Sequence, residues 1–279
     1  MYIAVILIGV TGVISASILY FLSKKFEVKE DPRMALVLDI LPGVNCGGCG
    51  FPGCGGFADA CVKAPSLAGL SCPVGKAEVM KSIATLLGQV ADESVPKIAV
   101  VCCNGSCEIC PHTNIYDGAK TCAIASSLYG GETGCSFGCL GWGDCVDSCI
   151  FDAIYVNPAT GLPEVSEDKC VACGACVKSC PKGIIEMRNK GPESHRIYVS
   201  CVNRDKGGIA RKACDKACIG CNKCVKECDC DAIIITQNVA YIDDAKCSLC
   251  RKCVQSCPTG SIVEAIFPNS SISEELINH

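Results

Sequence analysis

The sequence predicts an α+β protein in which several small cysteine-rich units follow a single N-terminal transmembrane helix. Three observations lead to this prediction. Residues 2–22 carry no charged side chain, 29 of the 279 residues are cysteine, and one spacing of cysteines recurs along the chain. Aromatic residues make up only 5%. Small units with so few large side chains need bound groups or cross-links for stability.

The first segment predicts a membrane anchor. A helix over residues 2–22 would be about 32 Å long, which is enough to cross a bilayer. No basic residue precedes the apolar run, unlike in a cleaved signal peptide, and four Lys or Arg residues follow it between positions 24 and 33. By the positive-inside rule, we expect a single-pass protein of the inner (cytoplasmic) membrane. Residues 1–24 would be the anchor, with the cysteine-rich units on the cytoplasmic side.

This topology bears on the chemistry of the cysteines. Disulfides need an oxidising compartment, whereas cytoplasmic thiols stay reduced. We therefore expect the cysteines to hold metal, and a disulfide scaffold without iron is the alternative.

A first group of cysteines predicts a small [4Fe–4S] domain over residues 25–95. Glycines around the group let the loop wrap closely and turn its backbone N–H groups toward cluster sulfurs. One [4Fe–4S] cluster suits four such thiolates, whereas zinc, the competing metal, usually takes two C-x2–4-C pairs. The spacing C-x2-C-x4-C-x17-C is formed by Cys46, Cys49, Cys54 and Cys72.

Three local features complete this part of the chain. Cys61 lies on an expected helix and should pack as a small apolar residue. Apolar spacing over residues 76–90 predicts a helix, and the run over 95–103 predicts a short strand.

The most specific signal is a ferredoxin-type motif in the last third of the chain. C-x2-C-x2-C-x3-C-P occupies residues 170–181 and 247–258, and the third copy at 218–229 has Asp229 in place of the proline. In two-cluster ferredoxins, the first three cysteines of such a motif bind one cluster and the fourth binds the other. We predict two tandem bacterial ferredoxin-like units, each with two [4Fe–4S] clusters, over residues 96–190 and 191–279.

The stretch around Trp142 is an altered copy of the same motif. Residues 135–154 align with residues 214–233 without a gap, and Trp142 falls on Cys221. The similarity extends across both units, which are therefore expected to be two copies of one sequence.

The altered copy needs a replacement ligand. Cys135 precedes Cys139 by about one helical turn, on the same side, so we expect Cys135 to bind the cluster. Trp142 is then an apolar lid over the cluster or an ordinary core residue. The ligand sets expected in the first unit are Cys135, Cys139, Cys145 and Cys180, and Cys149, Cys170, Cys173 and Cys176. In the second unit they are Cys218, Cys221, Cys224 and Cys257, and Cys228, Cys247, Cys250 and Cys253.

The remaining cysteines leave open a sixth cluster beside the five expected ones. The segment 102–110 is dense in cysteine, and one arrangement takes Cys102 or Cys103 together with Cys122, Cys201 and Cys214. The alternative is a set of reduced, buried thiols around the two units.

The predicted chemistry is electron transfer. All expected clusters are fully ligated, so no iron is open to a substrate, and we expect no catalytic residue in this chain. It contains neither a dinucleotide-binding nor a phosphate-binding glycine motif, so nicotinamide and flavin are not expected here. Basic residues between positions 182 and 212 either attract an acidic ferredoxin or form a solvated face. They do not cluster strongly enough to indicate nucleic acid.

The order of these elements resembles the B subunit of the Rnf membrane complex, in a long form with tandem ferredoxin repeats. The segments LPGVNCGGCGFPGCGGFADACV (41–62) and GCSFGCLGWGDCVDSC (134–149) carry the resemblance most strongly. It implies a subunit of an ion-translocating ferredoxin:NAD oxidoreductase. Such a subunit takes electrons from soluble reduced ferredoxin and relays them through its clusters toward NAD reduction, coupled to Na+ or H+ transport.

The same resemblance implies other membrane subunits and flavin-bearing subunits as partners. Two alternatives are an iron–sulfur subunit of another membrane redox complex, and a component of a system that reduces an iron–sulfur transcription regulator.

Overall fold

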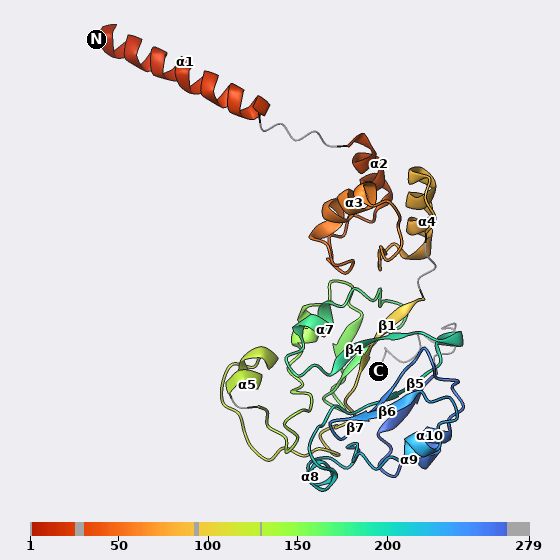
Figure 1. Ribbon diagram of the computed structural model, residues 1–279. Coiled ribbons are helices and arrows are strands. Elements are labelled where there is room, and N and C mark those ends of the chain that lie inside the picture. The colour runs from red at the N-terminus through yellow and green to blue at the C-terminus, as the bar shows by residue number, and fades with distance from the viewer. Residues whose placement is uncertain (1, 26–30, 92–94, 129, 267–279) are drawn as a thin grey trace, which may run out of the picture.

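The computed structural model describes residues 2–25, 31–91, 95–128 and 130–266. Part of the predicted basic stretch (26–30) and the end of the last predicted unit (267–279) lie outside these ranges. Figure 1 shows the N-terminal helix α1, then a small helical unit, then a larger body that contains all the strands. We call residues 31–91 the helical unit.

Helix α1 spans Tyr2–Lys25. No helix of the described residues is long and apolar enough to cross a membrane, so the expected single transmembrane helix is wrong.

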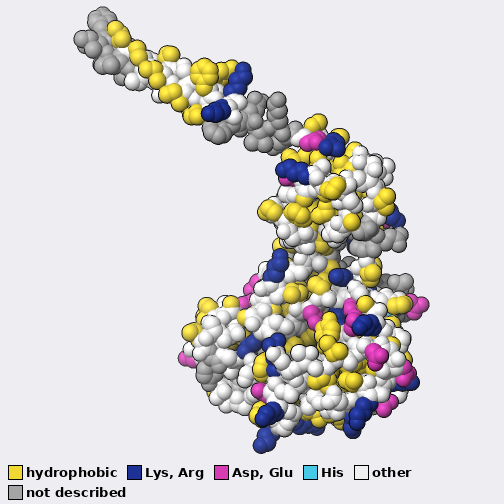
Figure 2. Space-filling model, in the orientation of Figure 1, with side chains coloured by type: hydrophobic (Ala, Val, Ile, Leu, Met, Phe, Trp, Pro, Cys, Tyr) yellow, Lys and Arg dark blue, Asp and Glu magenta, His cyan; other side chains and the backbone are white. Residues whose placement is uncertain are grey.

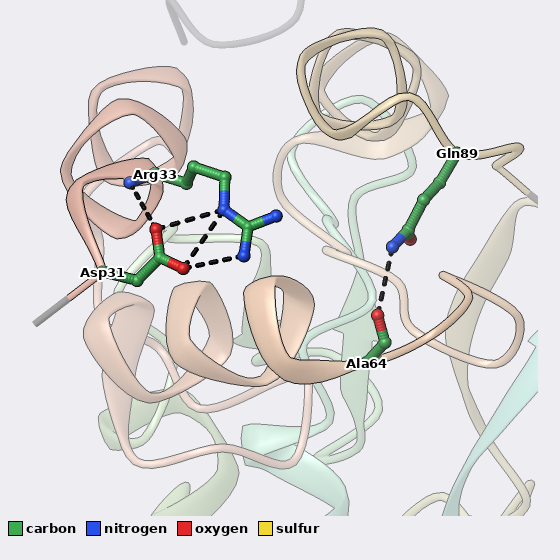
Figure 3. A network of polar contacts seen from close by, with 4 residues as sticks. All are labelled: Asp31, Arg33, Ala64 and Gln89. Atoms are coloured by element: carbon green, nitrogen blue, oxygen red, sulfur yellow. Dashed lines mark hydrogen bonds and ion pairs between the residues drawn. The ribbon is translucent and has the colours of Figure 1, made fainter.

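The helical unit is closed by polar contacts at its helix ends. The Asp31 carboxylate accepts a hydrogen bond from the Arg33 backbone N–H (2.9 Å) and so caps the first of its helices. Gln89 Nε2 donates to the Ala64 carbonyl oxygen (3.0 Å), which ties the ends of the other two together (Figure 3). The helices are α2 (Pro32–Ile40), α3 (Gly53–Lys63) and α4 (Lys76–Leu87).

The core of the helical unit follows the apolar spacing of the sequence. Phe57 and Cys61 of α3 pack with Ile83 of α4, and all three are almost completely buried. The apolar role expected for Cys61 is therefore confirmed. The helix predicted from residue 76 is also confirmed, and it ends at Leu87 because Gly88 takes a left-handed conformation (φ 65°).

The first ferredoxin-like unit, residues 97–189, is built from two strand pairs. Its first and last strands, β1 and β4, pair antiparallel, with Ala99 opposite Met187. Strands β2 and β3 form a hairpin with Tyr155 opposite Glu164. The elements are β1 (Lys97–Val101), α5 (Cys122–Leu128), α6 (Asp144–Asp147), β2 (Ile154–Val156), β3 (Pro163–Val165), α7 (Ala175–Ser179) and β4 (Ile185–Asn189).

The second ferredoxin-like unit, residues 196–265, has the same strand arrangement. Strand β5 pairs antiparallel with β8, and β6 pairs with β7. A 3-10 helix, η1 (Pro192–Ser194), connects the two units. The elements are β5 (Arg196–Val199), α8 (Gly207–Ala213), α9 (Lys223–Lys226), β6 (Ile233–Thr236), β7 (Val239–Ile242), α10 (Lys252–Ser256) and β8 (Ile262–Ala265).

Polar contacts fasten the two units to each other. The Arg188 guanidinium at the end of β4 donates to the Ile242 carbonyl of β7, and the Asn189 backbone N–H donates to the Asp244 carboxylate (2.6 Å). Arg188 is 3% exposed and also pairs with Glu186 (2.6 Å). These bonds cross the boundary between the units, so the two copies form one packed body.

Candidate metal centres

Four cysteine loops in the two units share one backbone turn. In each loop, a residue with positive φ precedes a short helix whose second residue is a cysteine. Glycine adopts this conformation without strain, and the turn brings cysteines on either side of it toward a common point. The turn residues are Gly143 (φ 85°), Gly174 (φ 75°), Asn222 (φ 60°) and Arg251 (φ 67°).

Two of the expected ligand sets each line one cavity. One cavity, in the first unit, is lined by Cys149, Cys170, Cys173 and Cys176. The other, in the second unit, is lined by Cys218, Cys221, Cys224 and Cys257. The other lining residues are mostly apolar, such as Ile154 and Ile262.

A third expected set gathers around α10. Burial raises the pKa of the Cys253 thiol to about 12, and the nearby thiols of Cys247, Cys250 and Cys228 add to this shift. Cys230, which had no predicted role, lies beside this set, with its sulfur 3.6 Å from that of Cys228.

The set in the helical unit is formed around a tight loop. Burial raises the pKa of Cys72, and the neighbouring thiols of Cys49 and Cys54 contribute to the shift. The Asn45 side chain closes the loop by accepting the Cys54 backbone N–H (2.7 Å). Cys46 lies at the border with the first ferredoxin-like unit, where its thiol neighbours that of Cys173.

In the altered loop, the structure brings Cys122 rather than Cys135 to the other three cysteines. The four cysteines that line a common cavity are Cys122, Cys139, Cys145 and Cys180. Burial raises the pKa of the Cys122 thiol, and hydrogen bonds from the backbone N–H groups of Asp144 and Trp142 oppose that shift. Trp142 stands where the other loops carry a cysteine, and Cys122 therefore supplies the fourth cysteine of the altered loop.

The Asp144 side chain holds Cys122 in this position. Its carboxylate accepts the backbone N–H groups of Cys122 (2.8 Å) and Ala123 (2.9 Å), at the start of α5. A carboxylate that accepts the free N–H groups of a first helical turn stabilises that end. Sequence reasoning placed Cys122 in the sixth arrangement and not in the altered loop, because this contact joins residues 22 positions apart.

The indole ring of Trp142 packs against the ring of Tyr116, with centroids 5.2 Å apart. Trp142 is not among the residues that line the cavity of Cys122 and Cys139. Of the two roles expected for Trp142, ordinary packing therefore describes its position. Its packing partner, Tyr116, lies in the segment between β1 and α5.

Of the cysteines of the sixth arrangement, Cys122 lies apart from the others, because it belongs to the altered loop. Cys201 and Cys214 share a cavity with both Cys102 and Cys103, and the same cavity is also lined by Cys110, Cys135 and Cys139. The Cys102 thiol donates to Glu186 Oε1 (3.1 Å).

The four-cysteine sets fit [4Fe–4S] clusters. Within the described ranges, no three His, Cys, Asp or Glu side chains lie close enough together to hold a single metal ion. Three of the sets surround cavities instead, and a [4Fe–4S] cluster is bound by cysteine thiolates around its outside. Burial raises the pKa of Cys139 and of Cys176 to about 12, because a buried thiolate is costly unless positive charge such as iron lies beside it.

The basic residues expected to face ferredoxin fall into two groups. Arg188 and Arg196 are buried and pair with Glu186 and Glu167, and Lys182 donates to the Ser136 carbonyl (2.7 Å), so these contribute to packing. Figure 2 shows Lys and Arg side chains at the lower end of the body, where Figure 1 places α8. The exposed members around α8 are Arg204, Lys206, Arg211 and Lys212.

Comparison with protein families defines the class of the chain. The family described as "4Fe-4S binding domain" matches residues 163–186 and 240–263. A second family, described as an Fe-S cluster family, matches residues 41–66. Together with the cysteine-lined cavities, these matches make the chain an iron–sulfur electron-transfer protein of the ferredoxin type.

Three relatives cover most of the chain. It is 45% identical over 237 residues to the B subunit of the Na(+)-translocating ferredoxin:NAD(+) oxidoreductase complex of Acetobacterium woodii, covering 85% of this chain and 70% of that protein. It is 37% identical over 275 residues to the B subunit of the proton-translocating ferredoxin:NAD(+) oxidoreductase complex of Clostridium ljungdahlii, covering 98% and 95%. The B subunit of the ion-translocating oxidoreductase complex of Methanosarcina acetivorans is 38% identical, covering 80% and 83%.

The chain therefore belongs to the B-subunit family of ion-translocating ferredoxin:NAD(+) oxidoreductases, the Rnf complexes. The resemblance seen in its motifs is confirmed.

Proposed function

We propose that this chain accepts electrons from reduced ferredoxin and relays them through [4Fe–4S] clusters toward NAD(+) reduction coupled to Na+ or H+ transport. The names of its relatives support the overall reaction. The observation that carries the relay is that the four-cysteine sets adjoin one another. Neighbouring thiol pairs join the set of the helical unit to the two sets of the first ferredoxin-like unit, and join the two sets of the second unit to each other.

The neighbouring pairs follow the chain of units. Cys46 of the helical unit neighbours Cys173 of the first ferredoxin-like unit. Within that unit, Cys176 neighbours Cys145 of the altered loop. Within the second unit, Cys253 neighbours Cys224. Electrons can pass between clusters held at such borders without a mobile carrier.

The exposed basic residues around α8 are the proposed docking surface for ferredoxin. Arg204, Lys206, Arg211 and Lys212 form a positive surface on the second unit. Positive surfaces accelerate the association of acidic partners, and salt weakens the effect.

We also propose that the chain works with membrane subunits and flavin-bearing subunits, with its cysteine units on the cytoplasmic side. All 29 cysteines are unpaired thiols, which supports a reducing compartment.

A direct test is reduction of the anaerobically purified chain by ferredoxin. Loss of absorbance near 400 nm after mixing with reduced ferredoxin is the expected result, and NADH alone should reduce the chain only slowly. Failure of reduced ferredoxin to bleach an iron-loaded chain would contradict the proposed function.

A further inference from the structure

A further cysteine-lined cavity lies between the two ferredoxin-like units. Its walls come from the loop after β1, the altered loop, the start of the second unit and the end of α8. Six of its cysteines belong to none of the sets described above: Cys102, Cys103, Cys110, Cys135, Cys201 and Cys214. Four of the six lie close to one another: Cys103, Cys110, Cys135 and Cys214.

Three of these four cysteines lie around one point of the backbone. A Cβ atom on Gly105 would lie 3.1 Å from Cβ of Cys110, 3.5 Å from Sγ of Cys214 and 3.8 Å from Sγ of Cys103. Cys135 joins the same buried cluster as Cys110 and Cys214. Because Gly105 has no side chain, the space beside these cysteines stays open.

Donor groups point at these sulfurs, as they do around cluster sulfurs. The Asn203 side chain, only 1% exposed, donates from Nδ2 to Sγ of Cys135 (3.4 Å). Backbone N–H groups of Cys139 and Gly105 hydrogen-bond to Cys103, and those of Phe137 and Gly138 hydrogen-bond to Cys135. Asn203 belongs to the second unit, so the cavity is completed only when both units are packed together.

We propose that Cys103, Cys110, Cys135 and Cys214 bind a sixth [4Fe–4S] cluster at the junction of the two units. Three ligands come from the first unit, and Cys214, at the C-terminal end of α8, comes from the second. The ligand set does not depend on the proposed function, whereas the role of the cluster as a relay rests on it.

The position of this cluster connects the two halves of the relay. Cys103 neighbours Cys180 of the altered-loop set. On the opposite side, Cys135 neighbours Cys201, whose sulfur accepts the backbone N–H of Cys218 (3.3 Å). A cluster here would join the clusters of the helical unit and the first unit to those of the second unit in one continuous series.

Cys201 lines the same cavity but is not assigned as a ligand. Its sulfur accepts the backbone N–H groups of Asn203 (3.4 Å) and Cys218 (3.3 Å). Its thiol neighbours those of Cys218 and Cys135, whereas Cys103 neighbours Cys110. This distinction makes Cys201 a matched control for the four proposed ligands.

Iron counting on the full chain tests the site. After anaerobic purification, metal and acid-labile sulfide analysis is expected to give about 24 Fe and no zinc in the wild type, because each cluster holds four Fe. Cys110→Ala and Cys214→Ala should each lose about four Fe and one EPR signal of the reduced chain. Cys107→Ala, which changes an exposed cysteine of the same loop, and Cys201→Ala should lose none.

The remaining EPR signals report whether each variant folds. If Cys214→Ala fails to fold, Cys110→Ala alone decides. A wild-type content of about 20 Fe that Cys110→Ala leaves unchanged, zinc in place of iron, or loss of the extra cluster in Cys201→Ala would overturn the assignment. Failure of ferredoxin to reduce a chain that holds about 24 Fe would instead contradict only the proposed function.

Discussion

Gly48 lies directly against Cys173. A Cβ atom on Gly48 would lie 2.8 Å from the Cα of Cys173 and 2.9 Å from its carbonyl oxygen. The contact joins the cysteine loop of the helical unit to a cysteine loop of the first ferredoxin-like unit. Any side chain at position 48 must therefore separate two proposed clusters.

Gly48→Val should slow electron transfer between the helical unit and the first ferredoxin-like unit. We expect the iron content to stay the same and the slowest phase of reduction by dithionite-reduced ferredoxin to become several-fold slower. Stopped-flow absorbance near 400 nm measures the phases. Gly55→Val is the control, because a Cβ on Gly55 meets nothing within 4 Å. Equal rates in the two variants would contradict the prediction.

Cys122 and Cys135 should serve different clusters. Cys122→Ala and Cys135→Ala are each expected to lose about four Fe. Combined with Cys110→Ala, Cys122→Ala should lose about eight Fe, whereas Cys135→Ala should still lose about four, because it removes a ligand from the same cluster. Metal analysis decides between these outcomes.

A buried cysteine outside the sets provides the control for this series. Cys102 is adjacent to Cys103, but its thiol donates to Glu186, so Cys102→Ala should keep all of its iron. If Cys122→Ala kept the full iron content, Cys122 would not be the replacement ligand.

The Asp144 carboxylate should determine how firmly the altered loop holds its cluster. Asp144→Ala removes the acceptor for two N–H groups of α5, and the loss of such a cap costs about 1 kcal/mol. We expect faster release of about four Fe to a chelator, followed by absorbance of the iron complex. Asp147→Ala changes an exposed residue of the same helix and should release iron at the wild-type rate.

Charge reversal around α8 should weaken the encounter with ferredoxin. The double variant Arg204→Glu, Lys212→Glu is expected to lower the second-order rate of reduction at low salt about tenfold. The difference should shrink as salt is raised, because exposed charges are screened. Lys81→Glu on α4 is the control, because each of these substitutions changes the charge of one position by the same amount. A rate that is independent of salt in the wild type would count against this docking surface.

The sequence predicted the local parts of the sites better than the distant ones. Cys170, Cys173 and Cys176 lie within one loop, and the turn at Gly174 determines how they face. Cys122 reaches its cavity through a cap made by a residue far along the chain. No periodicity or spacing encodes such a contact.

The burial of individual basic side chains was likewise beyond the sequence. Arg188 and Arg204 are equivalent by composition, yet one is buried over the ring of Tyr241, 4.5 Å from its centroid, and the other is exposed. Uncharged residues predicted the N-terminal helix itself, but the inference of a membrane span from them was wrong.

The bonds from Arg188 to Ile242 and from Asn189 to Asp244 have a kinetic consequence. Electronic coupling between two redox centres falls steeply with their separation. Two units joined by a loose tether would sample many separations, and their transfer rate would be an average dominated by rare close approaches. Units fastened across their boundary hold one separation, so the rate is a fixed property of the folded chain.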